Sequence, residues 1–153
     1  MSDARFEDGQ TRPVNLVARD EDDLAVVSAL VQDAVLSAGD LRWEKSKRRF
    51  VLLINRFRWE DVAAPKPERV RCLMVVDDVT SVQGQGLDRS DPGLVLSLLS
   101  LGFTPGTDGT GTLTLTFAGD GALAIGVEAL DLSLKDVSRP YLAPSGRVPG
   151  HPA

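Results

Sequence analysis

The sequence predicts an α+β fold in which one N-terminal helix packs on a curled, mostly antiparallel sheet or open barrel of seven to eight strands. Apolar residues recur with helical spacing in a single stretch near the N-terminus, whereas apolar and polar residues alternate through most of the chain after residue 40. Too few helices separate the predicted strands to build the parallel βαβ units of a doubly wound fold. A sheet that curls on itself and is closed by the helix therefore suits this order of elements.

The chain of 153 residues has the length of one domain. Residues 1–13 are polar and without pattern, and residues 138–153 include four prolines and two glycines. We therefore predict a disordered tail at 1–13, a single globular domain at 14–137 and a Pro/Gly-rich tail at 138–153.

Residues 15–18 are predicted as a short extended segment that leads into the helix. Asp20 is placed to cap the helix, and the three acids at 21–23 complement the positive end of the helix dipole. Apolar residues at 24, 27, 31, 34, 35 and 38 form a stripe that would bury one helix face. Gly39 marks the predicted end of the helix.

The first strands form a predicted hairpin, with 41–43 and 49–59 as its strands and 45–47 as its turn. Residues 50–54 are all apolar, which is typical of a central strand covered on both faces. Residues 69–77 alternate as another long strand, which the acids Asp77 and Asp78 end. Residues 79–85 continue that strand or form a short neighbour.

The later strands vary in clarity. Residues 94–103 are strongly apolar but fit neither period, so they predict either a buried central strand or an apolar edge used to form a homodimer. Residues 112–117 and 123–127 alternate around a Gly-Asp-Gly turn and predict a hairpin. Residues 130–134 suit a last strand, although a short amphipathic helix also fits them.

Composition excludes several classes of function. The longest apolar runs have five residues, far short of the ~20 of a membrane-spanning helix, and the N-terminus lacks a secretory pattern, so we predict a cytoplasmic protein.

Cys72 is the only cysteine and is interpreted as a buried hydrophobe. His151 is the only histidine, which disfavours zinc sites and histidine-dependent triads. Gly84-Gln85-Gly86 lacks the rest of any nucleotide motif. We therefore predict no metal, no cofactor and no catalytic residue.

Charge is divided unevenly along the chain. Residues 42–71 carry a local charge of +6 and the remainder carries −11, which gives the net −5. The acidic remainder argues against a general nucleic-acid binder. Antiparallel pairing of the second and third strands would place four arginines on one face, and clustered guanidiniums require an anionic counterpart. That counterpart is either internal acids or a partner; the arginines are Arg56, Arg58, Arg69 and Arg71.

Several blocks together resemble an alphaproteobacterial family known as domain of unknown function 2948. They are residues 20–24, 32–35, 48–50, 55–60, 86–89 and 117–121. The resemblance implies a small bacterial cytoplasmic protein without an assigned activity, and it supplies no catalytic residues. It also indicates a shared surface, which has the alternative interpretation of caps, turns and internal ion pairs. With the arginine cluster, the candidate binding residues are Arg48, Arg49, Asn55, Arg56, Arg58, Arg69, Arg71, Asp88 and Arg89.

Three functional hypotheses follow. The first is a non-enzymatic binding or accessory module whose arginine-rich face binds an acidic protein partner or a small anion. The second is an enzyme that holds a phosphorylated or carboxylated metabolite through arginines, with Asp88 or Glu60 as the base. The third is weak single-stranded nucleic-acid binding through the basic hairpin, with Trp43 and Trp59 stacking on bases.

Overall fold

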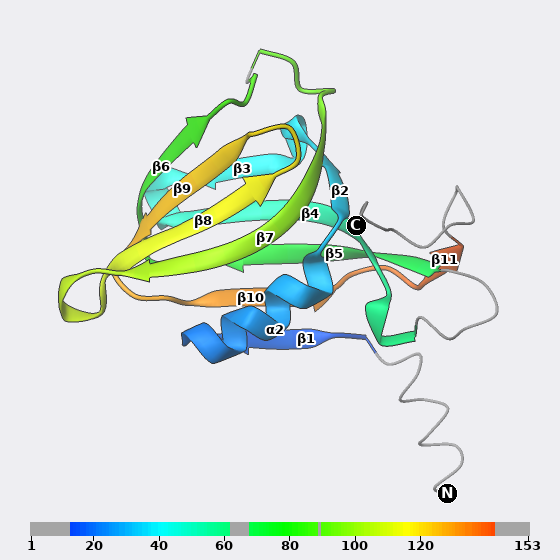
Figure 1. Ribbon diagram of the computed structural model, residues 1–153, viewed down its shortest axis with the longest axis horizontal. Helices are drawn as coiled ribbons and strands as arrows, with labels where there is room; N and C mark the ends of the chain where they lie inside the picture. The colour runs from blue at the N-terminus through cyan, green and yellow to red at the C-terminus, as the bar shows by residue number, and fades with distance from the viewer. Residues whose placement is uncertain (1–12, 62–67, 89, 143–153) are drawn as a thin grey trace, which may run out of the picture.

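The computed structural model describes residues 13–61, 68–88 and 90–142, which form one curled antiparallel sheet with a helix against it (Figure 1). Short 3₁₀ turns lie at η1 (Ala38–Asp40), η2 (Lys45–Lys47), η3 (Trp59–Asp61) and η4 (Thr107–Gly109). The helix is α2 (Glu21–Val31), and the strands are β1 (Asn15–Ala18), β2 (Ala34–Ser37), β3 (Leu41–Glu44), β4 (Arg49–Phe57), β5 (Glu68–Val76), β6 (Val79–Gln85), β7 (Val95–Pro105), β8 (Gly111–Phe117), β9 (Ala122–Val127), β10 (Leu132–Asp136) and β11 (Tyr141–Leu142).

The sheet runs in the order β1-β10-β5-β4-β2-β7-β8-β9-β6, with β11 added to β5 and β3 added to β4. Its two ends, β1 and β6, do not pair, so the sheet curls without closing into a barrel. The α+β class and the antiparallel sheet are confirmed. The count is corrected, because the described residues form 11 strands where seven to eight were predicted.

One additional strand, β2, comes from the predicted C-terminal part of the helix. The helix ends at Val31, well before Gly39, and Asp33 turns the chain in the left-handed region at φ 63°. Ala34 and Leu36 are then buried by strand alternation, and β2 pairs with β7. The apolar residues after 31 continued the helical spacing only by coincidence, so the predicted helix length is wrong.

Another additional strand, β11, lies in the segment predicted as a tail. Tyr141 and Leu142 pair with Arg69 and Glu68 of β5, so the described fold extends past the predicted boundary at residue 137. Residues 1–12 and 143–153 of the two predicted tails lie outside the described residues.

The helix begins as predicted and packs on the inside of the curled sheet. Asp20 caps it by accepting a hydrogen bond from the Asp23 N–H at 2.7 Å. Leu24, Val27 and Val31 are its buried residues, and the helix lies chiefly against β7 and β1. It thereby covers the core on the side where β1 ends the sheet (Figure 1).

The mixed periodicity of residues 94–103 has its cause in a bulge. The register of β7 against β8 shifts between Leu98 and Ser100, so Leu98 and Leu101 are both buried although they are three positions apart. At the bulge the Leu101 N–H donates to Ser28 Oγ of the helix at 3.0 Å. Because β7 pairs with both β2 and β8, it is a central strand and not the free edge considered for a homodimer.

Strand β4 is central, as predicted, between β5 on one edge and β2 followed by β3 on the other. Its inner residues Phe50, Leu52 and Ile54 are buried in the core. Val51 and Leu53 face outward and stay partly exposed, so the prediction that both faces are covered is wrong.

The remaining segments with alternative predictions form strands. Val79–Gln85 is a separate strand paired with β9, because Asp78 reverses the chain at φ 56°. Residues 132–136 form β10 in place of the alternative short helix, and the hairpin of β8 and β9 turns at Gly119 and Asp120, both with positive φ. Within the described ranges, no helix has the length and apolar character needed to cross a membrane.

Candidate functional site

The four arginines predicted to share one face are divided between the two faces of the sheet. In the β4–β5 register Arg56 lies opposite Val70 and is fully buried. Arg71 lies opposite Asn55 on the outer side of the sheet and is exposed. Because neighbours across a ladder point to the same side and successive residues alternate, Arg56 and Arg71 cannot form one cluster.

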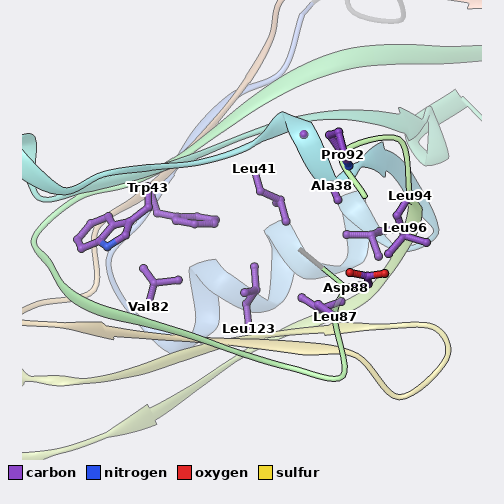
Figure 2. Close-up of a pocket in the computed structure, with 12 residues that line it drawn as sticks. Ala38, Leu41, Trp43, Val82, Leu87, Asp88, Pro92, Leu94, Leu96 and Leu123 are labelled. Carbon is purple, nitrogen blue, oxygen red and sulfur yellow. The ribbon is translucent and has the colours of Figure 1, made fainter. Parts of the chain in front are cut away.

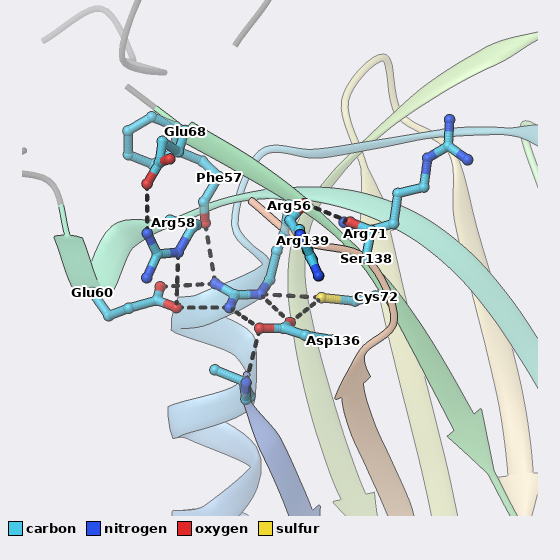
Figure 3. A network of polar contacts seen from close by, with 11 residues as sticks. Arg56, Phe57, Arg58, Glu60, Glu68, Arg71, Cys72, Asp136, Ser138 and Arg139 are labelled. Carbon is cyan, nitrogen blue, oxygen red and sulfur yellow. Dashed lines mark hydrogen bonds and ion pairs between the residues drawn. The ribbon is translucent and has the colours of Figure 1, made fainter. Parts of the chain in front are cut away.

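Arg56 is the centre of an internal ion-pair network (Figure 3). Its Nη1 and Nη2 donate to both carboxylate oxygens of Glu60 at 2.8 and 2.7 Å, and its Nε and Nη2 donate to Asp136 at 3.1 and 3.0 Å. Nη1 also donates to the Phe57 carbonyl at 3.3 Å. Asp136 accepts a further hydrogen bond from the Val14 N–H at 2.8 Å. The guanidinium, with a side chain that is 0% exposed, is thereby compensated in charge and in hydrogen bonds.

Arg58 extends this network toward β5. Its Nη1 donates to Glu68 at 2.6 Å, and its Nε lies 3.9 Å from Glu60 (Figure 3). Arg58 is only 2% exposed. Arg56 and Arg58 were candidates for binding an anion of a partner. Both are instead paired with acids inside the fold.

The buried Cys72 takes part in the same network, which goes beyond the small hydrophobe predicted. Its thiol donates to Asp136 Oδ1 at 2.8 Å, and its sulfur accepts from Arg56 Nε at 3.1 Å (Figure 3). Burial, with a further contribution from the Asp136 carboxylate, raises the pKa of the Cys72 thiol. The thiol thus stays protonated and unreactive at neutral pH.

The carboxylates of the network are weak bases. Burial is the largest single effect and would raise the pKa values of Glu60 and Asp136, but hydrogen bonds from Arg56, further hydrogen bonds and the nearby positive charge together hold both below their ordinary values. The same bonds raise the pKa of Arg56 against the opposing effect of its burial. A carboxylate with a lowered pKa accepts a proton poorly, so this geometry disfavours Glu60 as the general base of the enzyme hypothesis.

A second feature is the outer side of the sheet across β3, β4, β5, β10 and β1. The ladder registers align one row through Val17, Ser133, Val75, Val51 and Arg42, one from each strand. The adjacent row runs through Lys135, Leu73 and Leu53. We call this surface the outer basic face; its basic members are Arg42, Arg71 and Lys135, and its apolar members are Val17, Val51, Leu53, Leu73 and Val75.

The basic members of the outer basic face are exposed and lack internal anions. Among the described residues, no carboxylate forms an ion pair with Arg42, Arg71 or Lys135. Val17 is 49% exposed, which shows that the apolar part of the face also reaches solvent. Apolar side chains bordered by exposed charges are typical of a site of interaction. The row next to Val51 and Val75 carries both signs of charge, because Arg49 lies there opposite Glu44 and is paired with Asp77.

The other candidate residues lie around this face or away from it. Asn55 is at its end, where it accepts from Arg69 Nη1 through its carbonyl at 3.1 Å and from the Tyr141 hydroxyl through Oδ1 at 2.7 Å. Arg48 pairs with Glu128 at 2.7 Å beside the β3–β4 turn. Arg49 is the first residue of β4 and lies on the same outward side as Val51, where it pairs with Asp77 at 3.0 Å.

Asp88 lies in a different place, and Arg89 is outside the described residues. Asp88 borders a mostly apolar cavity of about 260 Å³ between β3 and β6 (Figure 2). Its Oδ1 accepts from the Ser90 N–H at 2.9 Å and from the Ser90 hydroxyl at 2.6 Å, and these two hydrogen bonds lower the pKa of Asp88.

Two members of the outer basic face, Arg42 and Lys135, were missed by sequence reasoning. Strand alternation turns each side chain outward, away from the apolar inner residues of its strand. That signal was present in the sequence, but the pairing of β10 with β5 and β1, which brings Lys135 beside Arg71, was not.

Together these features define a small α+β protein with an open antiparallel sheet, an internal arginine network and a separate basic outer surface. Within the described part of the chain, no group of three or more His, Cys, Asp and Glu side chains is arranged to hold a metal ion. The chain belongs to the family described as Protein of unknown function (DUF2948), which matches residues 14–151. No curated protein and no solved structure matches the chain.

Proposed function

We propose that this protein is a bacterial cytoplasmic, non-enzymatic interaction module that binds an acidic segment of a partner protein on the outer basic face. The observation that carries the proposal is the row of side chains that crosses five neighbouring strands from Val17 to Arg42. This row and the adjacent one present apolar area around Val51, Leu53 and Val75, and the basic residues Arg42, Arg71 and Lys135 border that area. Protein interfaces commonly have this arrangement of an apolar core and a polar rim.

Charge supports an acidic partner. The whole chain carries −5, so long-range repulsion would keep acidic proteins away from most of it. Arg42, Arg71 and Lys135 reverse that sign locally. A positive surface on a negative molecule steers an acidic partner to one face and sets its orientation.

The spacing of the charges favours a protein segment over a single small anion. Arg42 on β3 and Lys135 on β10 are three strand spacings apart, about 14 Å. One phosphate or carboxylate cannot reach both, whereas an extended or helical segment with several acids spans the distance. Apolar side chains of the same segment would cover Val51, Leu53 and Val75, which lie between the charges.

The experiment is selection from a displayed library of random peptides, followed by binding measurements on individual peptides. We expect the selected peptides to be rich in Asp and Glu, to contain apolar residues, and to bind more weakly as salt increases. The double variant Arg71→Glu/Lys135→Glu should lose at least about tenfold in affinity, because like charges then oppose the peptide.

The matched control is Lys45→Glu/Lys47→Glu, which makes the same change in net charge at the exposed η2 turn. It should leave the affinity nearly unchanged. Equal losses in the two double variants would show a general charge effect and refute the assigned surface. Selected peptides without an excess of acids would refute the acidic partner.

A further inference from the structure

The cavity lies between β3 and β6, where the sheet fails to close. At one end the Val79 N–H donates to the Arg48 carbonyl at 2.9 Å, and at the other the Gly39 N–H donates to the Pro92 carbonyl at 2.9 Å. Among the described residues, no strand pairs with the second edge of β3 or of β6. The two edges are therefore tied together at both ends and open between them, and this opening leads to the cavity.

The wall of the cavity is apolar except at one point. β3 contributes Leu41 and Trp43, and the facing strands β6 and β9 contribute Val82 and Leu123 (Figure 2). Asp88 is the only ionisable residue of the described lining. Figure 2 places its carboxylate beside Leu87 and Leu96, at the end of the cavity away from Trp43.

The volume sets the size of the occupant. Apolar cavities of about 150 Å³ stay free of water and hold one benzene molecule. The cavity here is about 260 Å³. If the size of the ligand scales with the volume of the cavity, this cavity accommodates a compact apolar group of about ten non-hydrogen atoms. Trp43 and Phe50 in the lining favour an aromatic body, through offset or edge-to-face ring contacts.

Asp88 sets the charge of the occupant. Both hydrogen bonds from Ser90 end on Oδ1, which fixes the carboxylate and keeps it ionised. No other described residue donates to Asp88, so Oδ2 is left for a ligand. An anionic ligand would place like charges together. Asp88 is exposed to solvent, so a neutral apolar ligand would gain no interaction from it, whereas a cation would gain a charge-assisted hydrogen bond.

We propose that this cavity is a binding site for a small aromatic amine, whose ring lies between Trp43 and Leu123 and whose ammonium group pairs with Asp88. The site is separate from the outer basic face. It depends neither on the acidic partner nor on the arginine network, so each proposal can fail without the other.

Three probes of similar size and different charge test the site: 2-phenylethylamine, ethylbenzene and phenylacetate. Binding is followed by the indole N–H signals in nitrogen-15 NMR, with Trp43→Phe used to assign them. Trp59 is an internal control, because it lies outside the cavity and its Nε1 donates to the Gln32 carbonyl at 3.1 Å. We expect 2-phenylethylamine to shift the Trp43 signal and not the Trp59 signal.

The affinity for 2-phenylethylamine should exceed the affinity for phenylacetate by at least about tenfold. Asp88→Asn keeps the acceptor for Ser90 and removes the charge, so it should abolish this preference while ethylbenzene binds as before. Asp91→Asn is the matched control, since Asp91 lies in the same loop and accepts instead from the Gly93 N–H at 3.0 Å. It should retain the preference.

Three results would overturn the proposal. The first is a Trp43 signal that no probe moves, which would show that the cavity binds no ligand of this class. The second is equal affinity for the amine and phenylacetate. The third is an amine preference that survives Asp88→Asn, which would place the cation elsewhere. As a check on the location, Val82→Trp fills the cavity and should abolish binding of both the amine and ethylbenzene.

Discussion

Replacement of Asp136 by asparagine should destabilise the fold by about 3 kcal/mol. Asp136 accepts hydrogen bonds from Arg56, Cys72 and the Val14 N–H, and its side chain is only 5% exposed. Removing one member of a buried ion pair costs about 3–5 kcal/mol, because the other charge stays buried. Glu60 still compensates part of the Arg56 charge, which places the expected loss at the lower end of that range.

The loss is large on the scale of the whole molecule. Domains are stable by about 5–15 kcal/mol, and each kcal/mol corresponds to about 2–4 °C in Tm for a chain of this size. We therefore expect Asp136→Asn to lower Tm by about 6–12 °C. Urea unfolding followed by circular dichroism gives the free energy, and an unchanged m-value shows that the two-state comparison holds.

Asp131→Asn is the control for the loss of one acidic charge. Asp131 lies 3.8 Å from Arg19, whose side chain is 73% exposed, and such surface pairs contribute at most about 1 kcal/mol. If Asp136→Asn were no more destabilising than Asp131→Asn, the buried network would not be a source of stability. The arginines at 56 and 58 would then need another explanation for their burial.

Three further predictions concern the same fold. Because the folded pKa values of Asp136 and Glu60 are lowered, their stabilisation is present above pH of about 5 and is lost as pH falls through the folded values; acid unfolding should be shallower in Asp136→Asn. Because the folded pKa of Cys72 is raised, stability should fall above pH of about 8.5, the native thiol should resist thiol reagents at pH 8, and Cys72→Ala should remove the alkaline loss. Gly111→Ala should be strongly destabilising in urea unfolding, since its Cβ would collide with the Phe103 ring and approach the Thr104 carbonyl oxygen to 2.6 Å, whereas Gly102→Ala meets nothing within 4 Å and should be tolerated.

Local signals predicted the elements whose ends are set by nearby residues. The helix starts at its Asp20 cap, and the β8–β9 hairpin turns at the predicted Gly-Asp-Gly segment. The end of the helix was missed because it depends on Asp33, which turns the chain so that β2 can pair with β7. That pairing joins residues distant in sequence, and no local pattern contains it.

The candidate site was also predictable only where local strand alternation determines it. Arg56 falls on the inner side of β4 with Phe50 and Ile54, so alternation alone already indicated burial. Its main partner Asp136 is 80 residues away, and only the β10–β5 register brings the two together. The outer basic face likewise depends on strand order, which places Lys135 beside β5.

The hydrogen bond from Val14 to Asp136 joins two residues that are 122 positions apart, at the two ends of the sheet's sequence. Contacts of such long range slow folding, because the intervening chain must be ordered before they form. During synthesis at ~5–20 residues per second, β1 waits roughly 6–24 s for β10 to be made. The apolar side of α2 lacks its main cover for part of this interval, until β7 has been made. The newly made chain is therefore most exposed to aggregation and proteolysis at its N-terminal end, and its last strands complete the protection of its first.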